Sequence, residues 1–208
     1  MARFRQSFPA ISAMYLQRSA DWLKTLFFLI LGISMGVFTE LFLPEEDKGR
    51  VALHLLEHLF PDGLQIDHSA VFLQSAGSHL GLLAVIFLSG LTSFGVPATY
   101  AALAYKGAAL GFSAAILLES LALRGVLTTV LAIVPSHLLI LPALILASSA
   151  AINYVSSRRP GNRRKRSLSS IEPGPYCLAF LFPLILILIA AVLEAFISPA
   201  FLQLIKSQ

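Results

Sequence analysis

Five long apolar stretches dominate the sequence, and they constrain its fold more than any other feature. A helix of about 20 residues crosses the hydrocarbon core of a bilayer, and each stretch comes close to or exceeds that length. We expect the spans at about residues 22–43, 79–97, 100–123, 125–155 and 175–204. The predicted fold class is therefore all-α: residues 1–208 form a single polytopic membrane helix bundle of five transmembrane helices, with short interfacial helices.

The composition excludes several other classes of protein. Of the 208 residues, 57% are hydrophobic and 12% are charged, whereas a soluble domain carries about 25% charged residues. Intrinsic disorder is excluded because so much apolar surface cannot remain solvated. The single cysteine, Cys177, excludes an intrachain disulfide and a CxxC motif.

The charges predict how the spans are oriented. Six arginines and lysines lie in the loop 156–174, whereas the loop 44–78 is rich in aspartate and glutamate. Basic loops stay in the cytoplasm, so the N-terminus and the loop 156–174 are expected inside, and the loop 44–78 and the C-terminus outside. A nucleic-acid site is the alternative for the basic cluster. Because apolar spans flank that cluster, we expect membrane lipid and no nucleic acid as its partner.

Prolines complicate two of the expected spans. Pro97 is expected to end or bend the second span, because proline lacks a backbone donor and clashes with the preceding turn. The fourth span contains Pro135 and Pro142. The residues before Pro135 could therefore form a half-helix or interfacial segment, with the true span starting near Ser136.

The loop 44–78 contains the pattern of an interfacial helix. Apolar residues recur at helical spacing within residues 51–60, and a similar helix is possible over residues 6–20. We expect four residues of the outer helix to face a partner or the membrane: Leu53, Leu56, Leu59 and Phe60.

The same segment matches a short metal-binding pattern. His54, Glu57 and His58 form H-x-x-E-H, which occurs in one class of metallopeptidase. A third ligand is needed, and the nearby candidates do not assemble a complete site. We therefore favour a polar helix face, and expect no metal, no cofactor, no catalytic residue and no enzymatic activity.

Several polar residues fall at membrane depth, where ionised side chains are costly and often functional. Glu40, Glu119, His137 and Glu194 are the candidates. They could pair with one another and with Arg124, which we favour, or form a proton or ion site.

Two pairs of glycines at four-residue spacing predict close helix packing. Gly32 and Gly36 lie in the first span, and Gly107 and Gly111 lie in the third. Such pairs let helix backbones approach closely. Packing within the chain is favoured, and a homodimer is the alternative.

The chain resembles a known family. The stretches FGVPATYAALAYKGAALGFSAAILLE, LAIVPSHLLILPALILASSAA and AAVLEAFISPA are similar to stage II sporulation protein M, and the match runs from about residue 24 to the C-terminus. Residues 194–199, EAFISP, are the most distinctive piece. Many relatives carry a glutamate shortly after the histidine equivalent to His137, whereas residues 138–140 here are Leu-Leu-Ile.

The resemblance implies a function in endospore formation. It implies a multi-pass protein of the mother-cell membrane at the sporulation septum, needed for engulfment of the forespore. The implied partners are peptidoglycan hydrolases resembling stage II sporulation proteins D and P, which this protein would recruit and position as a membrane scaffold. An ion- or solute-conducting transporter or channel is the alternative function, and a membrane metallopeptidase is a third.

Overall fold

A computed structural model describes residues 19–59, 68–121, 126, 130, 133–158 and 173–206. The predicted fold class is confirmed, because these residues are helical throughout apart from short turns and contain no strand. The helices are α2 (Ser19–Leu41), α3 (Glu45–Leu59), α4 (His68–Leu91), α5 (Gly95–Leu121), α7 (Val134–Arg158), α8 (Pro173–Ala179) and α9 (Leu181–Lys206).

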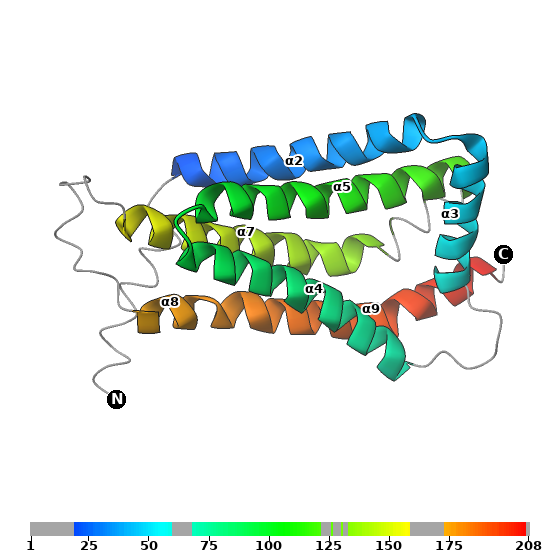
Figure 1. Cartoon of the computed structure of the whole chain (residues 1–208). Coiled ribbons are helices and arrows are strands. Elements are labelled where there is room, and N and C mark those ends of the chain that lie inside the picture. The colour runs from blue at the N-terminus through cyan, green and yellow to red at the C-terminus, as the bar shows by residue number, and fades with distance from the viewer. Residues whose placement is uncertain are drawn as a thin grey trace.

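Figure 1 shows α2, α4, α5, α7 and α9 running side by side along one axis, with α3 lying across one end of the bundle. Among the described residues, five segments are long and apolar enough to cross a membrane, as the sequence predicts. They are Trp22–Leu41, His68–Leu91, Gly95–Ser120, Val134–Arg158 and Gly174–Phe196. The chain is therefore a multi-pass membrane protein.

The second span differs most from its expected position. The structure places this helix at His68–Leu91 rather than at residues 79–97. The segment expected as the outer loop 44–78 thus contains α3 and the first turns of α4. Hydropathy missed these turns because residues 74–79 are small or polar, and a helix packed against neighbours does not need uniform hydrophobicity.

The chain reverses direction between α4 and α5 within residues 92–94. Pro97 lies in the first turn of α5, where no intrahelical donor is required, rather than at the end of the preceding helix. The hydroxyls of Ser89 and Thr99 lie 2.7 Å apart and join the two helices beside the turn. A Cβ at Gly95 would overlap the carbonyl oxygen of Ser89, so glycine is required for this approach.

Helix α7 occupies the centre of the bundle. It begins at Val134, so Pro135 falls in its first turn, and it continues through Pro142. Every residue from 147 to 155 is buried. The core gathers side chains of α4, α5, α8 and α9 around it, including Ile86, Leu103 and Tyr176.

The last span is divided near one end. Helices α8 and α9 are separated at Phe180. Pro183 has no N–H to donate to the carbonyl of Ala179 four residues earlier, which accounts for the local break. Phe180 instead donates to Cys177 at 3.2 Å, and the regular pattern resumes where Leu184 donates to Phe180 at 3.0 Å.

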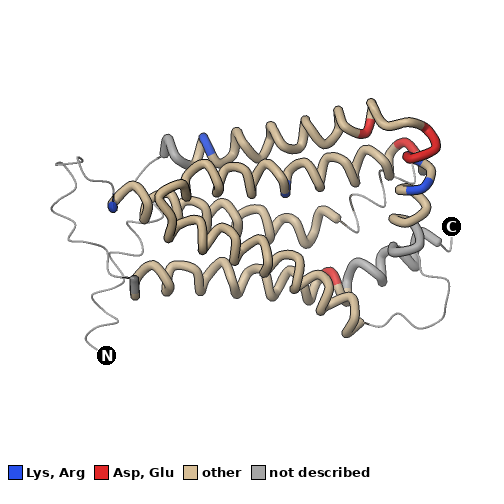
Figure 2. Tube along the Cα trace, in the orientation of Figure 1, with Lys and Arg blue, Asp and Glu red and all other residues tan. Residues whose placement is uncertain are grey.

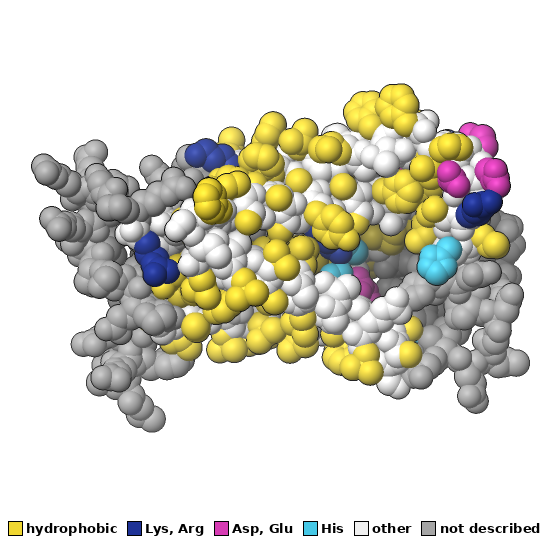
Figure 3. Space-filling model, viewed as in Figure 1, with side chains coloured by type: hydrophobic (Ala, Val, Ile, Leu, Met, Phe, Trp, Pro, Cys, Tyr) yellow, Lys and Arg dark blue, Asp and Glu magenta, His cyan; other side chains and the backbone are white. Residues whose placement is uncertain are grey.

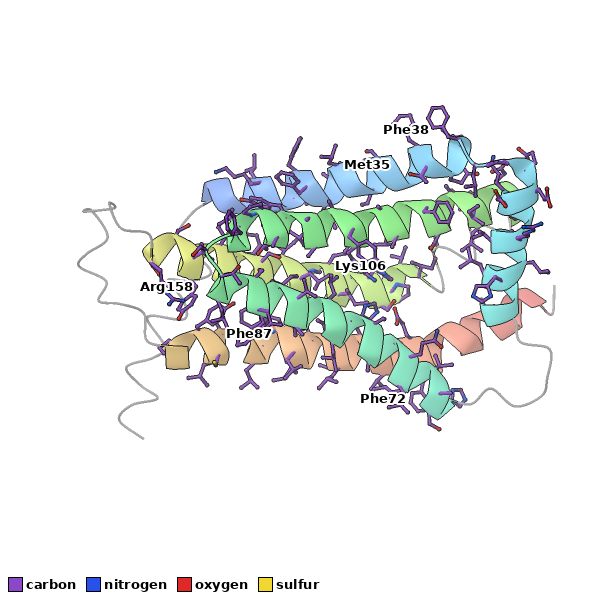
Figure 4. The ribbon with its side chains drawn as sticks, in the orientation of Figure 1. Met35, Phe38, Phe72, Phe87, Lys106 and Arg158 are labelled. Carbon is purple, nitrogen blue, oxygen red and sulfur yellow. The ribbon has the colours of Figure 1, made fainter. Side chains whose placement is uncertain are left out.

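The two ends of the bundle differ in charge (Figure 2). We call the end that α3 covers the acidic end, because Glu40 and Glu119 contact Lys48 of α3 there and three acidic residues occupy the first turn of α3. The opposite, basic end has Lys24 near the start of α2 and Arg158 at the end of α7 (Figure 4). Most of the basic loop 156–174, and residues 6–18 of the possible inner helix, lie outside the described residues.

Candidate functional site

Six polar residues from four helices meet inside the bundle. We call them the buried charge cluster: Ser75, His79, Lys106, Ser136, His137 and Glu194. They come from α4, α5, α7 and α9. Residues far apart in the sequence therefore form one polar site between spans that are otherwise apolar.

The Glu194 carboxylate is the acceptor at the centre of the cluster. The hydroxyl of Ser75 donates to its Oε2, and Nε2 of His79 lies 3.3 Å from the same oxygen. Ser136 faces this carboxylate from α7. Because donors surround it and its side chain is only 19% exposed, the carboxylate is held in place with its charge compensated.

Lys106 extends the cluster to α5. Its Nζ lies 3.4 Å from Nδ1 of His79, and Figure 4 shows its side chain in the interior of the bundle. His79 therefore stands between an ammonium and a carboxylate. The ring of His137 meets that of His79 edge to face, with centroids 6.2 Å apart.

Local helix geometry explains why these side chains converge. Ser75 and His79 are four residues apart and so share one face of α4. The ring of His137 is fixed at the start of α7, where its Nδ1 lies 2.9 Å from the carbonyl oxygen of Ile133. His68 also joins α4 to α9, because its Nδ1 lies 2.6 Å from the carbonyl oxygen of Ala195.

A second ionic group, the lysine bridge, lies at the acidic end. It consists of Lys48 of α3, 3.3 Å from Glu40 of α2 and 3.0 Å from Glu119 of α5. Contact with the Glu119 carboxylate raises the pKa of the Lys48 ammonium above its usual range, against the opposing effect of desolvation. The bridge thereby attaches α3 to the end of the α2–α5 pair.

Comparison of the chain with known proteins identifies a family. A sequence model of stage II sporulation protein M matches residues 25–199. The chain belongs to this family. It is therefore a sporulation-related membrane protein. No curated protein and no solved structure matches the chain.

In this stage II sporulation protein M family member, the predicted polar residues separate into two groups. Glu40 and Glu119 meet at the lysine bridge, whereas His137 and Glu194 belong to the buried charge cluster. The side chain of Arg124, an expected partner, lies outside the described residues.

Sequence reasoning missed Ser75, His79 and Ser136 as members of the cluster, and treated Lys106 only as an interruption of a span. One signal was available: Lys106 is a charged residue within an apolar stretch, and such residues are functional candidates. His79 was hidden because it was placed at the boundary of the second span rather than eleven residues into a helix that starts at His68.

The four glycines that the sequence predicts to pack closely lie between α2 and α5 in this family member. A Cβ at Gly32 or Gly36 would overlap the carbonyl oxygen of Ala104 or Ala108. A Cβ at Gly107 or Gly111 would overlap the carbonyl oxygen of Leu29 or Ile33. We call this contact the glycine seam; its glycines serve packing within the chain and are not available as a dimer surface.

The predicted partner-facing residues are only partly described. Leu53 is 60% exposed on α3. Leu56 and Leu59 belong to α3, but their side chains, like all of Phe60, lie outside the description. The side chains of Glu57 and His58 of the H-x-x-E-H pattern are likewise outside it. Within the described part of the chain, no group of three or more His, Cys, Asp or Glu residues is placed to hold a metal.

Proposed function

We propose that this family member is a membrane scaffold that recruits and positions peptidoglycan-degrading partners during engulfment of the forespore. The partners would resemble stage II sporulation proteins D and P, and the site of action would be the mother-cell membrane at the septum. The bundle would supply the anchor, and the partners would supply the chemistry. Family membership supports the setting, since it identifies a sporulation-related membrane protein.

The placement of α3 is the observation that carries the proposal. This helix lies across the acidic end of the bundle rather than along the spans (Figure 1). By the positive-inside rule, the opposite basic end faces the cytoplasm, so α3 would face the compartment that contains the wall. A polypeptide surface fixed at that position suits the docking of extracytoplasmic enzymes.

The surface of α3 combines charge with an apolar contact point. Glu45, Glu46 and Asp47 occupy its first turn, where negative charge also favours the helix dipole. Leu53 is exposed further along the helix, whereas Ala52 is buried and Lys48 is held by the lysine bridge. One side of α3 is therefore attached to the bundle, and the other remains available to a partner.

Affinity isolation in mild detergent tests the proposal. We expect Leu53→Ser, and more strongly the combined change of Leu53, Leu56 and Leu59 to serine, to insert normally but to lose co-purification of the hydrolases. His54→Ser is the matched control, because His54 is an exposed polar neighbour on the same helix. Unchanged co-purification with the triple variant would contradict docking on α3.

A second function, ion or solute conduction, is favoured by one observation. The buried charge cluster places Lys106, His79 and Glu194 within helices of spanning length, and such residues line many ion paths. Proteoliposomes test this function. Conduction requires a gradient to collapse with the wild-type protein and to persist with Glu194→Gln.

A further inference from the structure

Hydrogen bonds are divided unequally within the buried charge cluster. The Glu194 carboxylate accepts a hydrogen bond from Ser75 and contacts the ring of His79, so its charge is well compensated. Lys106 has three N–H donors, yet its only hydrogen bond among the described residues is the 3.4 Å contact with His79. An ammonium at membrane depth needs further acceptors, and water is the simplest group that supplies them.

The neighbours of His79 fix the form of its ring. An ammonium can only donate and an ionised carboxylate can only accept. In the tautomer that satisfies both neighbours, Nδ1 carries the lone pair that faces Lys106 and Nε2 carries the proton that faces Glu194. That tautomer has one vacant protonation position, Nδ1, directed at Lys106.

The cluster is open on one side. Figure 3 shows a hollow between α4 and α5, toward the acidic end, in which histidine, lysine and acidic side chains are visible. Figure 1 shows the cause, since α4 diverges from α5 as it approaches that end. Water that filled this hollow would meet charged side chains of the cluster.

The cluster is closed toward the basic end. Each helix that contributes a titratable residue places a fully buried aliphatic residue one or two turns further in that direction. These residues belong to one contiguous hydrophobic core: Ile86 on α4, Leu103 on α5, Ile140 on α7 and Ile187 on α9. This aliphatic layer offers no polar group to pass a proton onward.

We propose that the buried charge cluster is a proton-binding site, filled from the acidic end, in which His79 is the acceptor. A hydronium ion donates its proton to the Nδ1 lone pair, so that an N–H bond forms, one O–H bond breaks and water is released. Lys106 then loses its acceptor and faces a second cation. Glu194 becomes the counter-ion of the imidazolium through the existing Nε2 contact.

All neighbours of the ring bear on this step. Glu194 on α9 favours the protonated ring and Lys106 on α5 opposes it, while Ser75 on α4 and Ser136 on α7 orient the carboxylate. The ring of His137 on α7 meets that of His79 edge to face and is the remaining titratable neighbour. Proton uptake would thus loosen the link between α4 and α5 while retaining the one between α4 and α9. This site is independent of docking on α3.

Histidine nitrogen NMR of the full chain in lipid nanodiscs tests the proposal. With ¹⁵N-labelled histidine, His79→Gln assigns the His79 signals, and His54→Gln is the matched control, since it should leave them unchanged. We expect the protonated fraction of the wild-type ring to increase as the pH is lowered from 8 to 5. A ring that stays neutral at pH 5 would overturn the proposal.

Two variants test the two neighbours separately. At an intermediate pH, Lys106→Met should raise the ratio of protonated to neutral His79 at least fivefold, the factor expected of a unit charge about 4 Å away even in bulk water. Glu194→Gln should lower that ratio by a similar factor, and Lys106→Arg should leave it near the wild-type value. Either variant alone suffices if the other fails to fold, and a ratio unchanged in the folded variants overturns the proposal.

Proteoliposomes with an internal pH indicator test whether the aliphatic layer prevents protons from passing from the cluster to the basic end. Because of the aliphatic layer, the wild-type protein and Glu194→Gln should hold an imposed proton gradient equally well. Dissipation by the wild type that is lost in Glu194→Gln would overturn a one-sided binding site and favour conduction.

Discussion

Helix α5 takes part in two contacts that are built on opposite principles. One face presents Gly107 and Gly111 to α2, where the backbones meet with no room for a side chain. The adjacent residue, Lys106, points instead into the buried charge cluster. The glycine seam depends on shape, because close packing holds helices together where water is absent. The cluster depends on charge, and a hollow remains beside it.

The stability of the protein should therefore respond to substitution differently at the two faces of α5. At the seam, added volume is harmful whatever its chemistry, since backbone atoms lie where a Cβ would be. In the cluster, changes of volume are easier to accommodate, but removing one charge leaves another uncompensated in a poorly hydrated site. The variants below test this difference, beginning with the one expected to cost the most stability.

The largest effect is expected at the seam. Gly36→Leu would drive a side chain into the backbone of Ala108 and Phe112, so α2 must separate from α5. We expect a loss of at least about 3 kcal/mol, at the upper end of overpacking effects, measured by thermal unfolding in detergent. Gly81→Leu is the control, because nothing lies within 4 Å of a Cβ there. Equal stability of the two variants would refute the steric role of the seam.

A smaller loss is expected in the cluster. Glu194→Ala removes the acceptor of Ser75 and His79 and leaves Lys106 without a nearby counter-charge. Breaking a fully buried pair costs about 3–5 kcal/mol; because Glu194 is partly exposed, we expect about 1–3 kcal/mol in the same unfolding assay. Adding Lys106→Met should recover part of this loss. If the effects of Glu194→Ala and Lys106→Met simply add in the double variant, the two charges are not coupled.

Variants of the lysine bridge test whether an ionic contact at the edge of the bundle stabilises only the helix that it attaches, α3. Lys48→Ala should speed hydrogen exchange in α3 while leaving the spans protected, whereas Arg50→Ala, whose ion pairs remain within α3, should not. The pKa of Lys48 is raised in the folded protein. The stability that the Lys48 ammonium contributes is therefore complete below about pH 10.4, and it is lost only as the pH rises through the raised pKa. The effect should accordingly be the same at pH 7 and pH 9, and a difference between them would contradict the bridge.

The smallest effect is expected where a buried polar group has no partner. The hydroxyl of Ser148 is buried and makes no hydrogen bond to any described residue, so Ser148→Ala should change the free energy of unfolding by less than about 0.5 kcal/mol. Ser75→Ala is the informative contrast, because it removes a hydrogen bond to a carboxylate worth about 1.5–3 kcal/mol. Equal effects of the two serine variants would show that the cluster adds no stability of its own.

Much of the fold was predictable because hydropathy and helix length act locally. Five apolar stretches predicted five spans, and the glycine spacing predicted close packing. The start of α4 was not predictable in this way. Residues 68–78 are too polar to be recognised as a span, yet they are helical where His68 and Ser75 contact α9.

The site was predicted less completely than the fold. Glu194 and His137 were recognised as buried polar candidates, but their partners were not. His79 lies 115 residues from Glu194 and 27 residues from Lys106, and no pattern in one sequence indicates which charges at membrane depth will meet. Likewise, Lys48 lies 71 residues from Glu119, and only the folded position of α3 brings them together.

Composition and length are enough to establish that this chain crosses the membrane repeatedly, because the free energy of moving apolar stretches into lipid depends on them. Its motifs also determined the family. The packing of the helices, by contrast, sets the contact of the four seam glycines within the chain and the position of His79 between Lys106 and Glu194. The physical reason is that a hydrogen bond or a steric contact depends on distances of a few ångströms, which are set by how the helices pack.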